Sequence, residues 1–180
     1  MADSAQSPTK RALFLTGGPG VGKTTIVREA LARAAASAGG FYTEEIRSGG
    51  VRHGFRIITL DGRSAVLAHV DIKSRYRVSK YGVSLEGLEG VGVAAIRQAI
   101  QRSAVVVIDE VGKMELCSPS FREAVTEALA SGRKVLGTIM LAPHPWADAV
   151  KRCPEVEVVV VTQANRHQMA ERVRRWLESP

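Results

Sequence analysis

Aromatic residues, cysteines and long apolar runs are all scarce in this sequence of 180 residues. Phe, Trp and Tyr make up only 5% of the chain, which argues against the base-stacking surfaces of single-stranded nucleic-acid binders. The two cysteines, Cys117 and Cys153, form no CxxC or His-linked pattern, so we expect neither a disulfide framework nor a zinc site. The longest β-like apolar runs, 104–108 and 158–161, are too short to span a bilayer. Because the start of the chain is polar, we expect a cytoplasmic protein with no membrane partner.

The charge balance is basic, with 25 Lys and Arg against 18 Asp and Glu and a net charge of +7. Such a balance can indicate a nucleic-acid partner, but it also suits a protein that handles polyanionic nucleotides. Much of the excess lies on one expected helix near the end of the chain, at Arg166, Arg172, Arg174 and Arg175. Nucleic acid is therefore not expected as the main partner. The length predicts one domain over residues 1–180, with a polar extension at 1–10, and we expect a monomer.

Apolar segments alternate between strand-like and helix-like spacing along most of the chain. The expected helices cover residues 23–38, 85–101, 119–131, 146–152 and 165–178, and the expected buried strands cover 12–16, 104–109, 134–140 and 156–162. Continuous apolar strands separated by helices predict an α/β fold with a mainly parallel sheet between helices.

The segment after the first expected helix departs from this alternation. Residues 40–47 and 53–60 are strand-like and joined across Ser48-Gly49-Gly50, which predicts an antiparallel hairpin. A further short strand is expected at 63–68, followed by a charged, mobile loop at 71–82. We expect this region to be an antiparallel insertion or an edge of the sheet.

The strongest motif is a glycine-rich loop between the first expected strand and helix. Its residues are Gly17, Gly18, Pro19, Gly20, Val21, Gly22, Lys23 and Thr24, with Thr25 next to them. They match the phosphate-loop pattern G-x-x-x-x-G-K-[ST], in which glycines let backbone N–H groups surround a phosphate. Lys23 would neutralise β- and γ-phosphate oxygens, and the Thr24 hydroxyl would ligate Mg²⁺. The sequence therefore predicts a site for a Mg²⁺–nucleoside triphosphate.

A second motif is the acidic pair Asp109-Glu110 at the end of a buried apolar strand. A carboxylate at that end of a strand faces the crevice where open α/β sheets bind ligands, so Asp109 is expected to hold Mg²⁺. Glu110 is expected to act as the general base for water. Adjacent residues of a strand point to opposite sides, so we expect the chain to turn at Val111-Gly112 and let both carboxylates serve one site.

Hydrolysis also requires a positive charge at the γ-phosphate in the transition state. Lys113, just beyond the acidic pair, has the best position in the sequence, and Arg75 and Arg77 are the alternatives. Arg166, at the start of the last expected helix, is a candidate for contact with the base or ribose.

With both motifs in place, the sequence resembles the small nucleoside-triphosphatase family that includes thermophilic enzymes and the human cancer-related nucleoside triphosphatase. The likeness lies in TGGPGVGKTT (16–25), GFYTEEIRSGG (40–50), GFRIITLDG (54–62), YRVSKYGVSLEGLE (76–89), VIDEVGKMEL (107–116), LGTI (136–139) and TQANR (162–166). It covers nearly the whole chain beyond the first ten residues. The sequence departs from the family pattern at Gly18 and in MLAPHPW (140–146), which leaves the phosphate loop intact.

The resemblance implies slow, Mg²⁺-dependent hydrolysis of several nucleoside triphosphates to diphosphates. It also implies a phosphate-loop fold in which one strand separates the two motif strands, and it favours Glu110 as the water-activating residue. The sequence itself has no aromatic clamp and no base-reading motif, so we expect ATP, GTP, CTP and UTP all to serve as substrates.

Two alternatives remain from the sequence. A nucleotide or small-molecule kinase could use the same loop, with the hairpin and Arg75 and Arg77 as a lid over the acceptor. A nucleotide-dependent, RNA-associated binding protein would account for the charge of +7. Glu110 favours hydrolysis, because a kinase must exclude water from this position.

Overall fold

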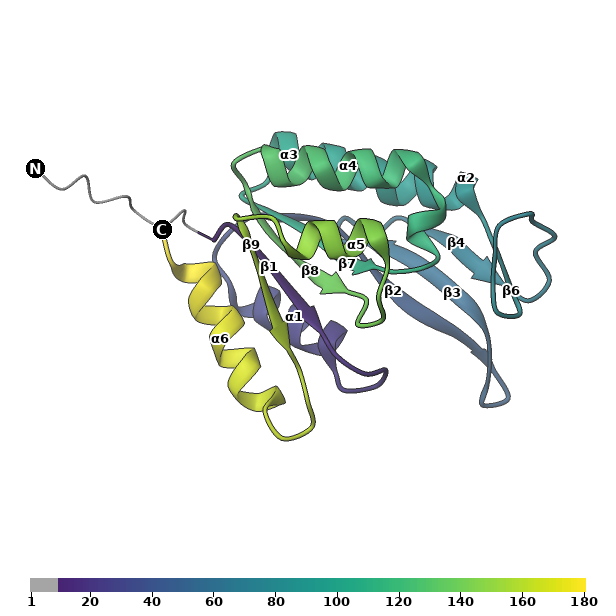
Figure 1. Ribbon diagram of the computed structural model, residues 1–180, viewed down its shortest axis with the longest axis horizontal. Coiled ribbons are helices and arrows are strands. Elements are labelled where there is room, and N and C mark those ends of the chain that lie inside the picture. Colours follow the sequence, from purple (N-terminus) through teal and green to yellow (C-terminus); the bar gives the residue numbers. More distant parts are fainter. Residues whose placement is uncertain (1–9) are drawn as a thin grey trace, which may run out of the picture.

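Nine strands form one mixed sheet through residues 10–180, the part of the chain that the computed structural model describes (Figure 1). The strands are β1 (Ala12–Thr16), β2 (Ala38–Ser48), β3 (Val51–Thr59), β4 (Ser64–His69), β5 (Arg77–Val78), β6 (Tyr81–Val83), β7 (Val105–Val111), β8 (Lys134–Ile139) and β9 (Val156–Val160). They lie in the order β5-β6-β4-β3-β2-β7-β8-β1-β9. The polar extension expected at 1–10 lies outside the described residues except for Lys10.

The parallel half of the sheet consists of β2, β7, β8, β1 and β9. Its strands are apolar on both faces; in β1, Leu13 and Leu15 enter one core cluster and Ala12 and Phe14 the other. Such double burial is the reason that parallel strands have continuous apolar runs. β8 lies between β1 and β7, the strands that lead into the two motifs. The predicted parallel sheet with one intervening strand is therefore confirmed.

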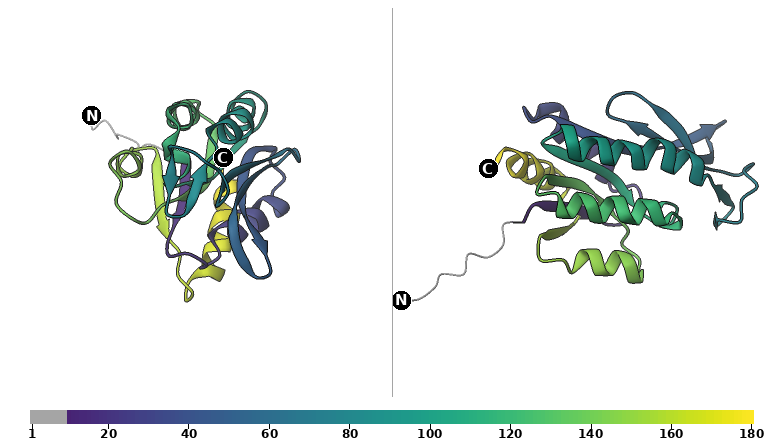
Figure 2. Two further views of the ribbon diagram at one scale, coloured as in Figure 1. Left: turned by 90° about the vertical axis from the view of Figure 1, so that its right-hand side faces the viewer. Right: turned by 90° about the horizontal axis from the view of Figure 1, so that it is seen from above.

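Helices cover both faces of this half. They are α1 (Lys23–Arg33), α2 (Leu85–Gly87), the π-helical η1 (Leu88–Val93), α3 (Ala94–Arg102), the 3₁₀ turn η2 (Glu115–Cys117), α4 (Pro119–Ala130), α5 (Pro145–Lys151) and α6 (Arg166–Glu178). One face carries α3, α4 and α5, and the other carries α1 and α6 (Figure 1). The left view of Figure 2 shows the same separation, with the teal and green helices above the sheet and the yellow α6 below it. No helix among residues 10–180 is both long enough and apolar enough to cross a membrane.

The antiparallel half continues the same sheet. β2 pairs with β7 through its first residues and then, as it runs on, with β3 in the opposite direction. Gly49 and Gly50 join β2 to β3 with φ of 55° and 79°, the positive values that a two-residue hairpin turn with the right twist requires. The predicted hairpin is confirmed, and β4, β6 and β5 extend it to the edge of the sheet.

Three predictions of secondary structure were wrong. The first helix ends at Arg33 rather than near 38, because Ala38, Gly39 and Gly40 pair with β7. The helix expected at 85–101 is divided by the π-helical segment η1 between α2 and α3. The expected loop 71–82 contains β5 and most of β6, which pair with each other as a short hairpin.

Gly40 fixes the junction between the two halves of the sheet. Its φ is 114°, and a Cβ atom there would lie 2.1 Å from the Val107 carbonyl oxygen of β7. We expect Gly40→Ala to lower the free energy of unfolding by about 3 kcal/mol, from backbone strain and overpacking together. Gly49→Ala is the matched control. A Cβ atom at Gly49 would meet no other atom within 4 Å, so the substitution adds only the strain of its positive φ of 55°, about 1 kcal/mol. Urea unfolding of both variants measures the difference, and equal losses would contradict this account of the junction.

Candidate functional site

Residues 17–22 form the loop that connects β1 to α1. Gly17, Gly20 and Gly22 have φ of 150°, 75° and 98°, values that turn successive backbone N–H groups inward. No side chain caps α1 at Gly22, so the first-turn N–H groups are not taken by a side-chain cap. The Lys23 ammonium folds over the loop and donates to the carbonyl oxygens of Gly17 and Gly18 at 2.9 and 3.0 Å. The loop therefore presents N–H groups, a helix N-terminus and an ammonium in one place, which is an arrangement suited to phosphate.

The end of β9 lies against this loop. A Cβ on Gly17 would meet the Val161 carbonyl oxygen at 2.4 Å, so only glycine permits this approach. The next turn is closed by Asn165, whose side chain accepts from the Thr162 N–H at 2.8 Å and donates to the Val160 carbonyl at 2.9 Å. Arg166 follows as the first residue of α6 and is exposed. The structure thus brings Arg166 to the same side of the sheet as the glycine-rich loop.

Asp109, near the end of β7, is the most buried carboxyl of the site, at 1% exposure. Its Oδ1 accepts a hydrogen bond from the Thr138 hydroxyl of β8, whereas Oδ2 has no partner among the described residues. Burial raises the pKa of Asp109, and the hydroxyls of Thr138 and Thr24 and the charge of Lys23 act against that rise. The loop and the acidic strand therefore converge, as the sequence predicted, with one carboxylate oxygen left free.

Glu110 lies beside Asp109 through an irregularity that the sequence did not predict. The chain was expected to turn directly after the acidic pair, but β7 continues to Val111, which pairs with Ile139. The pairing of β7 with β8 shifts register between Ile108 and Val111, so the regular alternation of side chains is interrupted at the pair itself. Burial, and then the charge of Asp109, raise the pKa of Glu110.

Glu115 is a third carboxyl of this region that sequence reasoning missed. The chain folds back after Gly112, where a Cβ would lie 2.4 Å from Glu110 Oε1 and 3.0 Å from Glu115 Oε2. Glu115 is only 4% exposed, and burial and the charge of Glu110 raise its pKa well above the ordinary value. In the sequence, Glu115 is an acidic residue in an expected loop after a strand, and such residues are usually exposed to solvent. The sequence therefore offers no reason to expect a buried side chain here.

The candidate cations lie in different places. Lys113 is exposed in the segment that follows β7, next to the carboxyls. Arg75 donates to the Tyr76 hydroxyl and Arg77 to the Lys80 carbonyl, both near the β5–β6 edge of the sheet. In the sheet, β6 and β7 are four strands apart, although the β5–β6 turn and Met114 after β7 line one cavity. A residue not predicted, Arg28 of α1, is close enough to help lower the pKa of Asp109.

The donor groups fit a magnesium ion that is shared with a substrate. No group of three or more His, Cys, Asp or Glu side chains between residues 10 and 180 is arranged to hold a metal by itself. The free Oδ2 of Asp109 and the Thr24 hydroxyl near it are instead oxygen ligands of the kind Mg²⁺ takes when phosphates and water complete its shell.

Comparison with known proteins agrees with this geometry. The sequence model of the NTPase family matches residues 12–174. The nucleoside-triphosphatase THEP1 of Thermotoga maritima is 43% identical over 157 residues, which cover 87% of this chain and 90% of that protein. The human cancer-related nucleoside-triphosphatase is 39% identical over 88% of this chain and 92% of its own length. The crystal structure of THEP1 from Aquifex aeolicus superposes with a TM-score of 0.86 at 34% identity, covering 93% of this chain and 99% of that one.

The burial of Glu115 has a measurable consequence for stability. An acid whose pKa is raised by folding destabilises the fold as the pH rises above its ordinary pKa, and the loss reaches about 1.4 kcal/mol for each unit of the rise once the pH passes the raised pKa. Glu115→Gln should therefore unfold at a higher temperature than the wild type at pH 8, without nucleotide or metal. The gain should shrink as the pH falls into the ordinary glutamate range, where Glu115 is protonated in the unfolded chain as well as in the fold. Glu123→Gln, at an exposed position of α4, is the control; a gain independent of pH would contradict the assignment.

Proposed function

The chain belongs to the NTPase family and is a nucleoside-triphosphatase, and we propose that it performs Mg²⁺-dependent hydrolysis of ATP, GTP, CTP and UTP to the diphosphate and phosphate. The single observation that carries the metal-dependent part is the buried, unpartnered Oδ2 of Asp109 beside Lys23 and Thr24. A free carboxylate oxygen at a phosphate-binding loop is costly unless a cation and its phosphate ligand complete the site.

Phosphate binding falls to residues 17–22 and to the start of α1. The β-phosphate would be surrounded by backbone N–H groups of Gly18, Gly20, Val21 and Gly22; Pro19 has no N–H to contribute. Lys23, Thr24 and Thr25 would contact the phosphates from the N-terminus of α1. Lys23 already holds the ammonium over the loop through two carbonyl contacts. Binding requires only that it exchange these acceptors for β- and γ-phosphate oxygens. Arg166 would lie along the base or ribose.

Asp109 and Thr24 would hold Mg²⁺, which when bound supplies positive charge to the β- and γ-phosphate oxygens. Thr138 keeps Asp109 in place by donating to Oδ1 and leaves Oδ2 for the ion. With Oδ1 held by Thr138 and Oδ2 bound to the ion, the carboxylate would orient the metal without changing its own position.

Glu110 would accept the proton of the attacking water. Its burial and the neighbouring Asp109 charge raise its pKa, which makes it a better base than an ordinary glutamate. Lys113, adjacent in the same segment, would stabilise the charge that develops at the γ-phosphate, whereas Arg75 and Arg77 donate to the Tyr76 hydroxyl and the Lys80 carbonyl. We also propose that the protein is a monomer and that it is cytoplasmic; the free thiols of Cys117 and Cys153 accord with a reducing compartment.

The two carboxylates should fail in different ways. Glu110→Gln keeps size and hydrogen bonding but loses the base, so hydrolysis should slow by about 10²–10⁴-fold while Mg²⁺–triphosphate binds nearly as in the wild type. Asp109→Asn should impair Mg²⁺-dependent binding and turnover together. Phosphate release and calorimetric binding of a non-hydrolysable ATP analogue separate the two, with Glu123→Gln as the control. Full hydrolysis by Glu110→Gln would show that water is activated elsewhere and would favour a kinase with incidental hydrolysis.

The range of nucleoside triphosphates that the enzyme hydrolyses tests the prediction that it has no groups that recognise one particular base. We expect kcat/KM for ATP, GTP, CTP and UTP to differ by less than about a thousandfold, because larger ratios require buried polar groups that the wrong base leaves unpaired. Phosphate release from the four triphosphates, with no acceptor present and with or without Mg²⁺, measures this directly. A strong preference for one base, or release without divalent metal, would overturn the proposed activity.

A further inference from the structure

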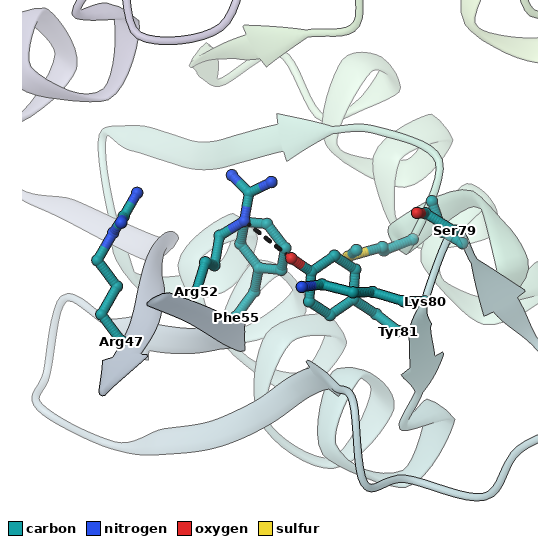
Figure 3. A pocket seen from close by; sticks show the side chains of 8 residues that line it. Arg47, Arg52, Phe55, Ser79, Lys80 and Tyr81 are labelled. Atoms are coloured by element: carbon teal, nitrogen blue, oxygen red, sulfur yellow. Dashed lines mark hydrogen bonds between the residues drawn. The ribbon is translucent and has the colours of Figure 1, made fainter. Parts of the chain in front are cut away.

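A cavity of about 560 Å³ opens on the antiparallel half of the sheet (Figure 3). It lies between the β2–β3 hairpin, the β5–β6 turn and the segment after β7, and its size is typical of small-molecule sites. Its lining residues are Arg47, Arg52, Phe55, Val78, Ser79, Lys80, Tyr81 and Met114. The apolar members and Tyr81 are buried or half-buried and form a floor, whereas the cations and Ser79 are exposed and form a rim.

Arg52 is fixed in this cavity by its neighbours. Its guanidinium carbon lies 5.0 Å from the centre of the Phe55 ring, and its Nε donates to the Tyr81 hydroxyl at 3.0 Å (Figure 3). Its Nη1 donates to Glu45 at 2.8 Å, whereas Nη2 makes no hydrogen bond to the described part of the chain. The planar group is therefore held in one orientation, with a donor available at the rim.

The rim carries more positive charge than the hairpin needs. Glu45 pairs with Arg47 at 2.6 Å and with Arg52 at 2.8 Å, so one carboxylate serves two arginines. Lys80 adds a third cation, 5.5 Å from the centre of the Tyr81 ring, with no carboxylate in salt-bridge range among residues 10–180. Three cations against one carboxylate leave this group with a net charge of +2. That charge matches a phosphate monoester, which carries nearly two negative charges at neutral pH.

We propose that this cavity is a second ligand site that binds a small molecule combining a flat ring with a phosphate monoester, as in a nucleoside 5′-monophosphate. The ring would lie beside Met114 and against the face of the Arg52 guanidinium that is turned away from Phe55, because guanidinium groups stack readily on aromatic rings. The phosphate would take the free Nη2 of Arg52 and the ammonium of Lys80.

The cavity is separate from the phosphate loop. Its lining includes none of residues 17–25, and four strand spacings, about 19 Å, lie between β3 and β1. Met114 nevertheless joins the cavity to the segment that carries Glu110 and Glu115. The proposal goes beyond the hydrolysis proposed above and does not depend on it.

Calorimetric titration with AMP and UMP tests the site, with the wild type and Lys23→Ala side by side. Both proteins should bind, because Lys23 belongs to the phosphate loop only. Lys80→Gln, whose side chain makes no hydrogen bond to the described residues, should weaken binding about tenfold to a hundredfold, and Arg52→Gln with Lys80→Gln should abolish it. Arg97→Gln with Lys151→Gln removes the same two kinds of charge on other elements and should change nothing.

Several results would overturn the proposal. The first is that neither nucleotide binds at millimolar concentration, and the second is that the control pair Arg97→Gln with Lys151→Gln weakens nucleotide binding equally. The third is loss of binding in Lys23→Ala, which would place the ligand in the phosphate loop. Binding of a single-stranded oligonucleotide without binding of either monophosphate would equally contradict a small-molecule site. Failure of triphosphate hydrolysis alone would leave the second site unaffected.

Discussion

The free oxygen of Asp109 is the constraint on which the rest of this structure depends. A carboxylate at 1% exposure is tolerated only where hydrogen bonds and nearby positive charge offset its desolvation. β8 supplies the hydroxyl of Thr138 because it is the immediate neighbour of β7, and β1 on its other side leads into the loop that carries Lys23 and Thr24. The order of three parallel strands thus determines which groups surround the carboxylate. It also leaves one oxygen directed to the place where a cation and a phosphate would complete the site.

Much of this arrangement could be predicted from the sequence. The glycine-rich loop, the acidic strand end and the hairpin at Gly49-Gly50 all depend on local patterns that act through short-range backbone geometry. The predicted first helix is too long at its end because the local spacing of residues does not show that Gly39 and Gly40 belong to a strand. Gly40 lets β2 approach the backbone of β7, and Gly39 lets it approach Ala99 of α3; both contacts join segments far apart in sequence. Glu115 was missed for the same kind of reason, since its burial results from the fold of the chain around Gly112.

The irregularity in β7 illustrates the limit of periodicity arguments. Alternation predicted that Asp109 and Glu110 would point apart unless the chain turned, and a turn was the simplest resolution. The structure uses a register shift within the strand, which retains the backbone pairing of Val111 with Ile139 and the apolar burial of Val111. The two halves of the sheet carry different features. Its parallel half carries the glycine-rich loop and Asp109, for which we propose triphosphate binding, and its antiparallel half presents the cationic cavity at Arg52 and Lys80.

The central claim is that Asp109 and the phosphate loop form one site that only metal and triphosphate together complete. Thermal unfolding with a non-hydrolysable ATP analogue, Mg²⁺, both, or neither tests it most directly, because ligand that binds the native state raises the unfolding temperature. The account predicts a large rise only when both are present, and loss of that rise in Asp109→Asn. An equal rise with the analogue in the presence of a chelator, or an unchanged rise in Asp109→Asn, would contradict it.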